Sequence, residues 1–170
     1  VEPVITIDGG DTLQAECGVE LTLPEATVAD DCDSAATVEI TGLDGLDTKD
    51  PVVGVFTVTY EAMDASSNVA TAELTVTVED TLDPVITIVG GNTLTAECGV
   101  LMEMPAATAV DDCDGALDAG ILDQGGLDVI NPQIGEYQVT YAALDATGNQ
   151  GEAILTVTVE DTTAPVVTIT

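Results

Sequence analysis

The segment GVFTVTYEAMDASSN at residues 54–68 returns at residues 135–149 as GEYQVTYAALDATGN. In the first copy Phe56, Val58 and Tyr60 alternate with polar or smaller residues. Such alternation places one set of side chains on each face of an extended strand. Both copies then continue into an Asp-Ala-containing turn that ends in asparagine. The segment therefore predicts a half-buried β-strand followed by a tight loop.

The repeat extends over almost the whole chain at a constant offset of 81 residues, and more than half of the aligned positions are identical. This pattern is specific for tandem duplication. The other repeated motifs are PVITI at 3–7 and 84–88, ECG at 16–18 and 97–99, DDCD at 30–33 and 111–114, and LTVTVEDT at 74–81 and 155–162. We predict two domains, residues 1–80 and 81–161, followed at 162–170 by the first strand of a third repeat or by an assembly strand.

Period-two alternation and β-branched residues recur in both copies, and no stretch has helical periodicity. Several short strands in a unit of this size predict an antiparallel β-sandwich, with Tyr60 and Tyr141 packed inward. The expected strands lie near 3–8, 12–17, 25–30, 37–42, 55–63 and 69–79, with equivalents 81 residues later.

The chain is strongly acidic, because 32 Asp and Glu residues oppose one basic residue and the formal net charge is −31. Nucleic acid and anionic membranes would repel it, so neither is expected as a partner. A hydrophobic content of 45% excludes a disordered acidic tail. No apolar run approaches the roughly 18 residues of a membrane span, and no segment reads as a signal peptide. If the protein is secreted, we expect these residues to be a mature or excised piece.

Catalysis is not expected, because the chain has no histidine and its only basic side chain is Lys49. A nucleophile needs a base to activate it. Paired carboxylates can hydrolyse glycosides, but that reaction needs a defined cleft, which two small repeats do not predict. We therefore predict that the protein is not an enzyme.

Each repeat contains two cysteines, Cys17 and Cys32 in the first and Cys98 and Cys113 in the second. Of the three possible pairings, the repeat favours Cys17–Cys32 and Cys98–Cys113, because each unit can then fold alone. Zinc binding is the alternative, but it is disfavoured by the lack of histidine. Disulfides in small domains indicate an oxidising, extracellular setting.

Taken together, PVITI, ECG, DDCD, the segment at 135–149 and the DTTAP join at 161–165 resemble bacterial immunoglobulin-like repeats of the hyalin-repeat type. The resemblance covers nearly the whole chain, although Ser67 of the first copy stands where the family has glycine. It implies two tandem immunoglobulin-like β-sandwiches in a large secreted or surface protein, such as an adhesin. It also implies a spacer or adhesion role without catalysis.

Acidic residues concentrate where successive units would meet. The last strand of a unit runs toward the end at which the chain leaves that unit. The loop before this strand, at 64–68 or 145–149, is therefore expected at the opposite end, where the chain enters. For the second unit the entering chain is the join, residues 79–84. With one basic side chain in the chain, a hard divalent cation is needed to neutralise these carboxylates, and calcium is the best match. The predicted calcium ligands are Glu79, Asp80, Asp83, Asp111, Asp112, Asp114, Asp145 and Asn149 around the join, and Asp30, Asp31, Asp33, Asp64 and Asn68 in the first unit.

Simpler interpretations of these residues remain open. Asp145 and Asn149 can shape their loop through an Asx-turn, with Gly148 in a left-handed conformation. The DDCD motif can be a solvated loop around a disulfide, and the acids of the join can keep the strand ends soluble.

The predicted function is that of a calcium-stiffened, extracellular or cell-surface spacer of an adhesin or filament, in contact with neighbouring repeats or other copies of the chain. A ligand-binding module for a glycan or protein receptor is the alternative. Against it, the chain has no tryptophan and no aromatic cluster on which a sugar could stack. Residues 163–170 could also pair with an exposed strand edge of another copy.

Overall fold

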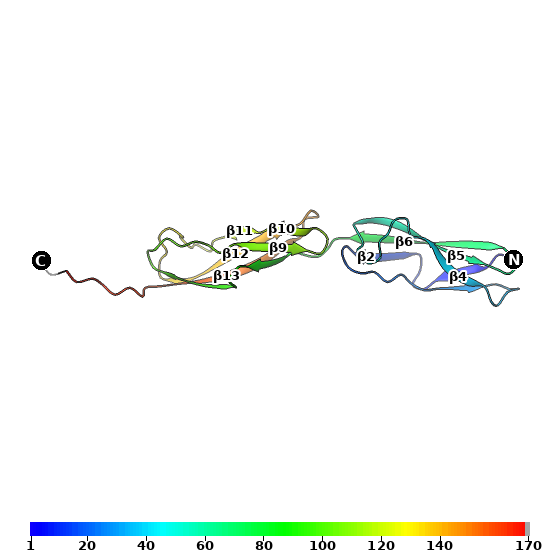
Figure 1. The fold of residues 1–170 in the computed structure, drawn as a ribbon, viewed down its shortest axis with the longest axis horizontal. Coiled ribbons are helices and arrows are strands. Elements are labelled where there is room, and N and C mark those ends of the chain that lie inside the picture. The colour runs from blue at the N-terminus through cyan, green and yellow to red at the C-terminus, as the bar shows by residue number, and fades with distance from the viewer. Residues whose placement is uncertain (169–170) are drawn as a thin grey trace. The chain divides into compact units, whose positions relative to one another are not determined.

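The computed structural model describes residues 1–168 and divides into two compact units, Val1–Thr81 and Leu82–Thr170. Each unit is built from strands and connecting loops (Figure 1). The described residues contain no helix that is long and apolar enough to cross a membrane. The first unit comprises β1 (Val4–Ile7), β2 (Thr12–Glu16), β3 (Ala26–Ala29), β4 (Thr37–Gly42), β5 (Gly54–Met63) and β6 (Val69–Glu79). The second comprises β7 (Val85–Ile88), β8 (Thr93–Glu97), β9 (Ala107–Asp111), β10 (Gly115–Asp118), β11 (Gly120–Asp123), β12 (Gly135–Leu144) and β13 (Gln150–Glu160).

The first unit is a two-sheet sandwich. β1 pairs antiparallel with β3, and the larger sheet has the order β2-β6-β5-β4. One pair departs from the predicted antiparallel arrangement, because β2 runs parallel to β6, with Thr12 opposite Thr75. The first strand segment passes from one sheet to the other at Gly9 and Gly10, whose positive φ angles of 87° and 105° suit glycine. After this turn β2 has the same direction as the last strand of the unit.

The second unit repeats this plan with an additional strand. Its sheets have the orders β10-β9-β7 and β11-β12-β13-β8, and β8 is again parallel to β13. The strand expected near 118–123 is present as β11, whereas β10 was not predicted: the chain leaves one sheet after β10 and enters the other at β11. Where the first unit has Thr37 and Val38, the second has Asp118 and Ala119, which favour strands less.

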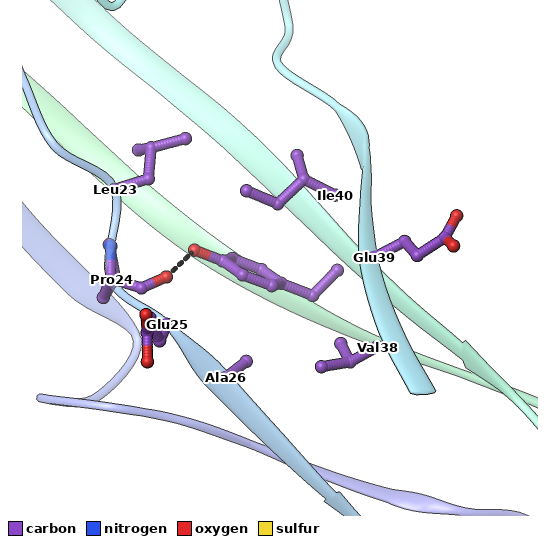
Figure 2. Close-up of a pocket in the computed structure, with 8 residues that line it drawn as sticks. Leu23, Pro24, Glu25, Ala26, Val38, Glu39 and Ile40 are labelled. Atoms are coloured by element: carbon purple, nitrogen blue, oxygen red, sulfur yellow. Dashed lines mark hydrogen bonds between the residues drawn. The ribbon is translucent and has the colours of Figure 1, made fainter. Parts of the chain in front are cut away.

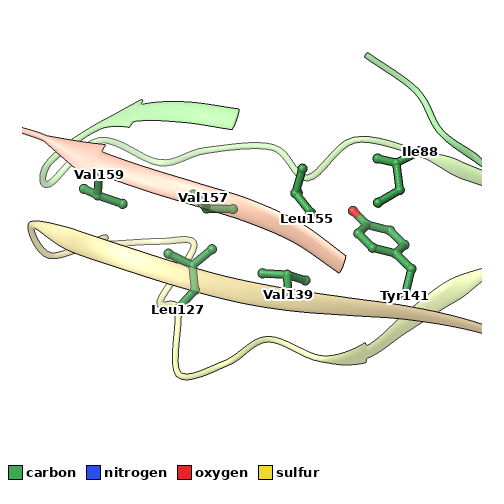
Figure 3. Packing of buried hydrophobic residues seen from close by; sticks show 7 residues of the cluster. All are labelled: Ile88, Leu127, Val139, Tyr141, Leu155, Val157 and Val159. Carbon is green, nitrogen blue, oxygen red and sulfur yellow. The ribbon is translucent and has the colours of Figure 1, made fainter. Parts of the chain in front are cut away.

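Alternating residues of the two longest strands form the core of the second unit. Val139 and Tyr141 of β12 lie against Leu155, Val157 and Val159 of β13 (Figure 3). All three valines are at most 1% exposed. The equivalent alternation in β5 and β6 buries the core of the first unit, so the period-two pattern of the sequence is confirmed as the packing pattern.

The two predicted inward tyrosines are confirmed as core residues, because Tyr60 is 3% and Tyr141 is 2% exposed. Each hydroxyl donates a hydrogen bond of 2.7 Å to a proline carbonyl, of Pro24 and Pro105 respectively. Burial raises the pKa of both hydroxyls. Each tyrosine therefore ties the central sheet to the loop that leads into the opposite sheet.

Residues 162–168 form no strand, and Val166 and Val167 are 91% and 84% exposed. The predicted strand at 162–170 therefore has no partner strand within its described part, and residues 169 and 170 lie outside the described residues. Its role in a further repeat or in assembly stays a prediction.

Gly151 is required by a close approach of two backbones. A Cβ at this position would collide with the carbonyl group of Pro84, whereas at Gly120 nothing lies within 4 Å. We predict that Gly151→Ala destabilises the second unit by about 1–3 kcal/mol, as overpacking does, and that Gly120→Ala has little effect. Thermal unfolding of both variants tests this, and equal melting temperatures would contradict it.

Candidate metal site at the N-terminal poles

We define the N-terminal pole of a unit as the end at which its last strand begins, and the C-terminal pole as the end at which that strand stops. The DDCD motif lies at the N-terminal pole in both units. In the first, Asp33 Oδ2 accepts a hydrogen bond of 2.9 Å from the backbone N–H of Ala65. In the second, Asp114 Oδ2 accepts the equivalent bond of 2.6 Å from Ala146. The motif and the loop before the last strand therefore lie side by side.

Asp145 organises the loop at 145–149. Its Oδ1 accepts backbone hydrogen bonds from Thr147, Gly148 and Asn149 at 2.9, 2.6 and 2.8 Å. Its Oδ2 accepts a bond of 2.7 Å from the side-chain amide of Asn149. Gly148 has a φ of 103°, which suits glycine. The Asx-turn interpretation is therefore confirmed for these residues, and a metal role would be additional to it.

The pKa of Asp145 lies below its ordinary value. Burial alone would raise it, but the hydrogen bonds from Asn149, Gly148 and Thr147 together outweigh burial. The pKa of Asp64 in the first unit is lowered chiefly by the side-chain hydrogen bond from Asn68. Both carboxylates are nearly enclosed, with Asp64 7% and Asp145 6% exposed. These two side chains are thus held in the charged form.

Asp111 lies beside Asp145 at the N-terminal pole of the second unit. It is 4% exposed, and its Oδ1 accepts backbone hydrogen bonds from Cys113 and Asp114 at 2.7 and 3.0 Å. A carboxylate oxygen of Asp111 and one of Asp145 lie within 4.8 Å of each other. Two enclosed anionic groups therefore converge on one small region.

Asp83 and Asp112 lie beside Asp111. Both are exposed, and together with Asp111 they line a surface hollow whose other walls are Leu82, Val85 and Val110. The second unit thus collects carboxylates from three separate segments: the start of the unit, the DDCD motif and the loop after β12. The other two predicted ligands from the join, Glu79 and Asp80, belong to the first unit, where they end and follow β6.

The N-terminal pole of the first unit contains an unsatisfied carboxylate oxygen. Asp30 Oδ1 accepts backbone hydrogen bonds from Cys32 and Asp33 at 2.8 and 2.7 Å. Its Oδ2 is shielded from solvent and accepts no hydrogen bond from any described residue. A buried acceptor without a partner is costly, and a bound cation would remove this cost. Asp31 is exposed at the same loop.

The glutamates of the ECG motifs were not predicted to have a role, yet they fix the outgoing chain. Glu16 accepts hydrogen bonds from the backbone and hydroxyl of Thr81 at 2.6 and 2.8 Å. Glu97 accepts the equivalent bonds from Thr162 at 3.0 and 2.6 Å, and these lower its pKa. ECG and EDT both recur in the two copies of the repeat, and this recurrence was the sequence signal that could have indicated the contact between Glu and Thr.

These contacts leave little of the join free. Thr81 is attached to Glu16 at the C-terminal pole of the first unit. Pro84 is packed against Gly151 in the second unit. Only residues 82 and 83 lie between the two attachment points, so the chain spans at most about 11 Å from Thr81 to Pro84.

The predicted disulfides within each unit are wrong. Cys32 and Cys98 carry free thiols, whereas Cys17 and Cys113 are disulfide-bonded. The reason is that β6 separates the two cysteines of the first unit. Cys17 donates a backbone hydrogen bond to Glu79 at the end of this 11-residue strand, whereas Cys32 lies in the DDCD motif, beside the loop that precedes the strand. The strand spans about 35 Å, whereas bonded cysteines have Cα atoms at most about 7 Å apart.

A separate hollow of about 340 Å³ opens beside Tyr60 in the first unit. Ala26, Val38 and Ile40 also line this hollow, and the dashed line in Figure 2 marks the hydrogen bond that the carbonyl of Pro24 accepts from the Tyr60 hydroxyl. Because that hydroxyl donates its one hydrogen to Pro24, it has no hydrogen left to donate to a ligand in the hollow. It does not favour the ligand-binding alternative.

Two β-sandwiches that repeat one plan define a class of all-β tandem modules with immunoglobulin-like architecture. The chain belongs to the family described as bacterial surface protein, Ig-like domain, whose model matches residues 5–78 and 86–159. This match confirms the predicted immunoglobulin-like fold and indicates a cell-surface or extracellular location. The hyalin-repeat type is not part of the match and stays a prediction.

Solved structures with a similar fold have low sequence identity. The fibronectin(III)-like modules of Clostridium thermocellum CbhA are 19% identical, with a TM-score of 0.36 over 93% of this chain and 95% of that chain. Protocadherin gamma B2 extracellular cadherin domains 3–6 are 16% identical, with a TM-score of 0.40 over 92% and 47%. Drosophila N-cadherin EC1–4 is 16% identical, with a TM-score of 0.41 over 95% and 50%. The chain spans about half of the length of these two cadherin fragments. No curated protein sequence matches the chain.

The lowered pKa of Asp145 predicts a pH-dependent contribution to stability. A carboxyl whose folded pKa is depressed stabilises the fold above its unfolded pKa of about 3.9, and this contribution is lost as the pH falls through the folded value. Asp145→Asn should therefore melt well below the charge-matched control Glu136→Gln at about pH 6, and the gap should shrink below about pH 4. Calorimetry across this range checks it, and a gap that does not change with pH would contradict it.

Proposed function

We propose that the chain is a spacer of an extracellular surface protein, such as an adhesin or filament, in which calcium at the N-terminal pole of a unit stiffens the join from the preceding unit. Ig-like families are typically structural modules rather than enzymes. The observation that carries the proposal is the convergence of the enclosed carboxylates Asp111 and Asp145 in a chain with one basic side chain.

A bound cation would neutralise the negative charges of the two neighbouring carboxylates. The oxygens of Asp111 and Asp145 lie within 4.8 Å, so two like charges repel at the N-terminal pole of the second unit. Lys49, the one basic side chain of the sequence, belongs to the first unit. A divalent ion offsets both charges, while the backbone hydrogen bonds to each carboxylate keep its oxygens in place.

Further ligands are available from the short join. Asp83 and Asp112 line the same hollow as Asp111. Asp80 is three residues before Asp83, so the covalent chain keeps the two within about 11 Å whatever the angle between the units. We propose that Asp80, Asp83 and Asp112 complete the ligand set. Asp114 and Asn149 support it by orienting the loop, and Glu79 adds negative charge nearby.

Calcium fits this donor set better than other metals. Only oxygen donors are offered, and calcium accepts 6–8 of them in flexible geometry, whereas magnesium demands a strict octahedron. Zinc sites in proteins are built mainly on cysteine and histidine ligands, and histidine is absent from the sequence. The first unit would bind a second ion through Asp30 and Asp64, and the unsatisfied Oδ2 of Asp30 supports this extension.

Calcium is expected to bind the whole chain with the affinity of extracellular modules, a Kd of about 10⁻⁴–10⁻³ M, and to raise the melting temperature. Asp111→Asn keeps the acceptor for the backbone of Cys113 but removes the charge, so it should weaken binding at the second unit at least about tenfold. Isothermal titration measures both.

Glu136→Gln serves as the matched control, because it removes the same charge from an exposed position on β12. It should bind calcium as the wild type does. No heat of binding at millimolar calcium would overturn the proposed site, as would equal affinities for Asp111→Asn and Glu136→Gln.

A further inference from the structure

Two loops of the second unit lie side by side at its C-terminal pole. The residue before Gly99 donates a backbone hydrogen bond to Glu160, the last residue of β13, which places the first loop at this pole. The N–H of Gly99 donates a hydrogen bond of 2.9 Å to the carbonyl of Pro132, and that of Met102 donates one of 3.0 Å to Val129. The two loops therefore run antiparallel, because residue number rises along one as it falls along the other.

This arrangement brings two exposed apolar side chains together. Leu101 comes directly before Met102 and Ile130 directly after Val129, so the two residues flank the same hydrogen bond. Leu101 is 67% and Ile130 is 71% exposed. Isolated exposed apolar residues are ordinary on a protein surface, whereas neighbouring ones indicate an interaction site.

The first unit has opposite charges at these two positions. It contains the same two backbone hydrogen bonds, at 2.9 and 2.7 Å, but Glu20 stands where the second unit has Leu101, and Lys49 where it has Ile130. Both charged residues are exposed. The fold of the repeat therefore does not require an apolar pair at this place, and the pair is a property of the second unit alone.

A hollow of about 270 Å³ opens beside Leu101. Most of its lining is apolar, and two carboxylates complete it. The apolar lining residues besides Leu101 are Leu94, Ala96, Val100 and Met102, and the acidic ones are Glu97 and Glu103. The hollow can therefore take an apolar side chain, with negative charge available to its neighbours.

We propose that this surface, formed by Leu101, Ile130 and the hollow, is a docking site for a protein segment that carries an apolar side chain between lysine or arginine residues. Charge complementarity selects such a partner, because acidic residues line the hollow and the second unit has no basic side chain. The apolar side chain would fill the hollow, while the flanking cations would face Glu97 and Glu103. The site lies at the pole opposite to Asp111 and Asp145, so it does not depend on calcium.

A second copy of this chain fits the surface less well. Each chain carries a net charge of −31, and two such hollows would bring carboxylates against carboxylates. An anionic membrane would be repelled for the same reason.

The probe is a fluorescent, terminally blocked peptide, Lys-Lys-Leu-Val-Leu-Lys-Lys, added to the whole chain in about 0.15 M NaCl with a chelator. Its anisotropy should rise on binding. Two control peptides separate the contributions: Lys-Lys-Gly-Ser-Gly-Lys-Lys keeps the charge, and Glu-Glu-Leu-Val-Leu-Glu-Glu keeps the apolar centre. Each should bind at least about tenfold more weakly. Equal affinity for the probe and either control would overturn the proposal, and this comparison needs no variant.

The double variant Leu101→Glu/Ile130→Lys locates the site. It introduces the residues of the first unit and leaves the net charge unchanged, so lost binding cannot result from lost negative charge. We expect affinity for the probe to fall at least about tenfold, with a melting temperature close to that of the wild type. The matched control, Val166→Glu/Val167→Lys, changes two exposed residues outside the site and should bind as the wild type does. Equal affinities for the two double variants would overturn the proposal.

Two further measurements test the assignment of the partner. Glu103→Gln should weaken binding of the probe by about two- to fivefold, whereas Glu136→Gln, which removes an exposed charge elsewhere in the unit, should not. Sedimentation should show a wild-type monomer under the same conditions. A dimer that Leu101→Glu/Ile130→Lys abolishes would make a second copy the occupant and would overturn the proposal.

Discussion

Both poles of each unit depend on one interaction, the hydrogen bond from a backbone N–H group to a carboxylate side chain. Asp145 and Asp111 each satisfy several N–H groups of their own loops. Glu16 performs the same task for the outgoing chain at Thr81. Because acidic side chains shape the loops, negative charge accumulates at the poles without basic partners. The calcium proposal follows from this: the groups that define the loops also create an electrostatic cost that a hard cation can remove.

A second constraint is the short length of chain between the units. The join is attached to the first unit through Thr81 and to the second through Pro84, so only two residues are free. Chain geometry alone keeps Asp80 within about 11 Å of Asp83. The calcium proposal uses this constraint, because it assigns both of these acids to one ion.

The sequence predicted those features that depend on local periodicity. Alternation in β5 and β12 was enough to predict the sandwich and the burial of Tyr60 and Tyr141, because a pleated strand exposes alternate residues to opposite faces. Asp145 and Asn149 were recognised because an Asx-turn is a local interaction. The cysteine pairing failed because it assumed that each unit closes its own bridge, whereas the length of β6 separates Cys17 from Cys32. Glu16 was missed because its partner Thr81 is remote in sequence.

The most direct test of the account is small-angle X-ray scattering of the whole chain, with its four cysteines reduced and alkylated. Profiles are compared in millimolar calcium and after treatment with a chelator. The account predicts a narrow distribution of maximum dimensions with calcium and a broader one after chelation, with each unit still folded. Identical profiles under the two conditions would contradict the claim that an ion at the pole stiffens the join.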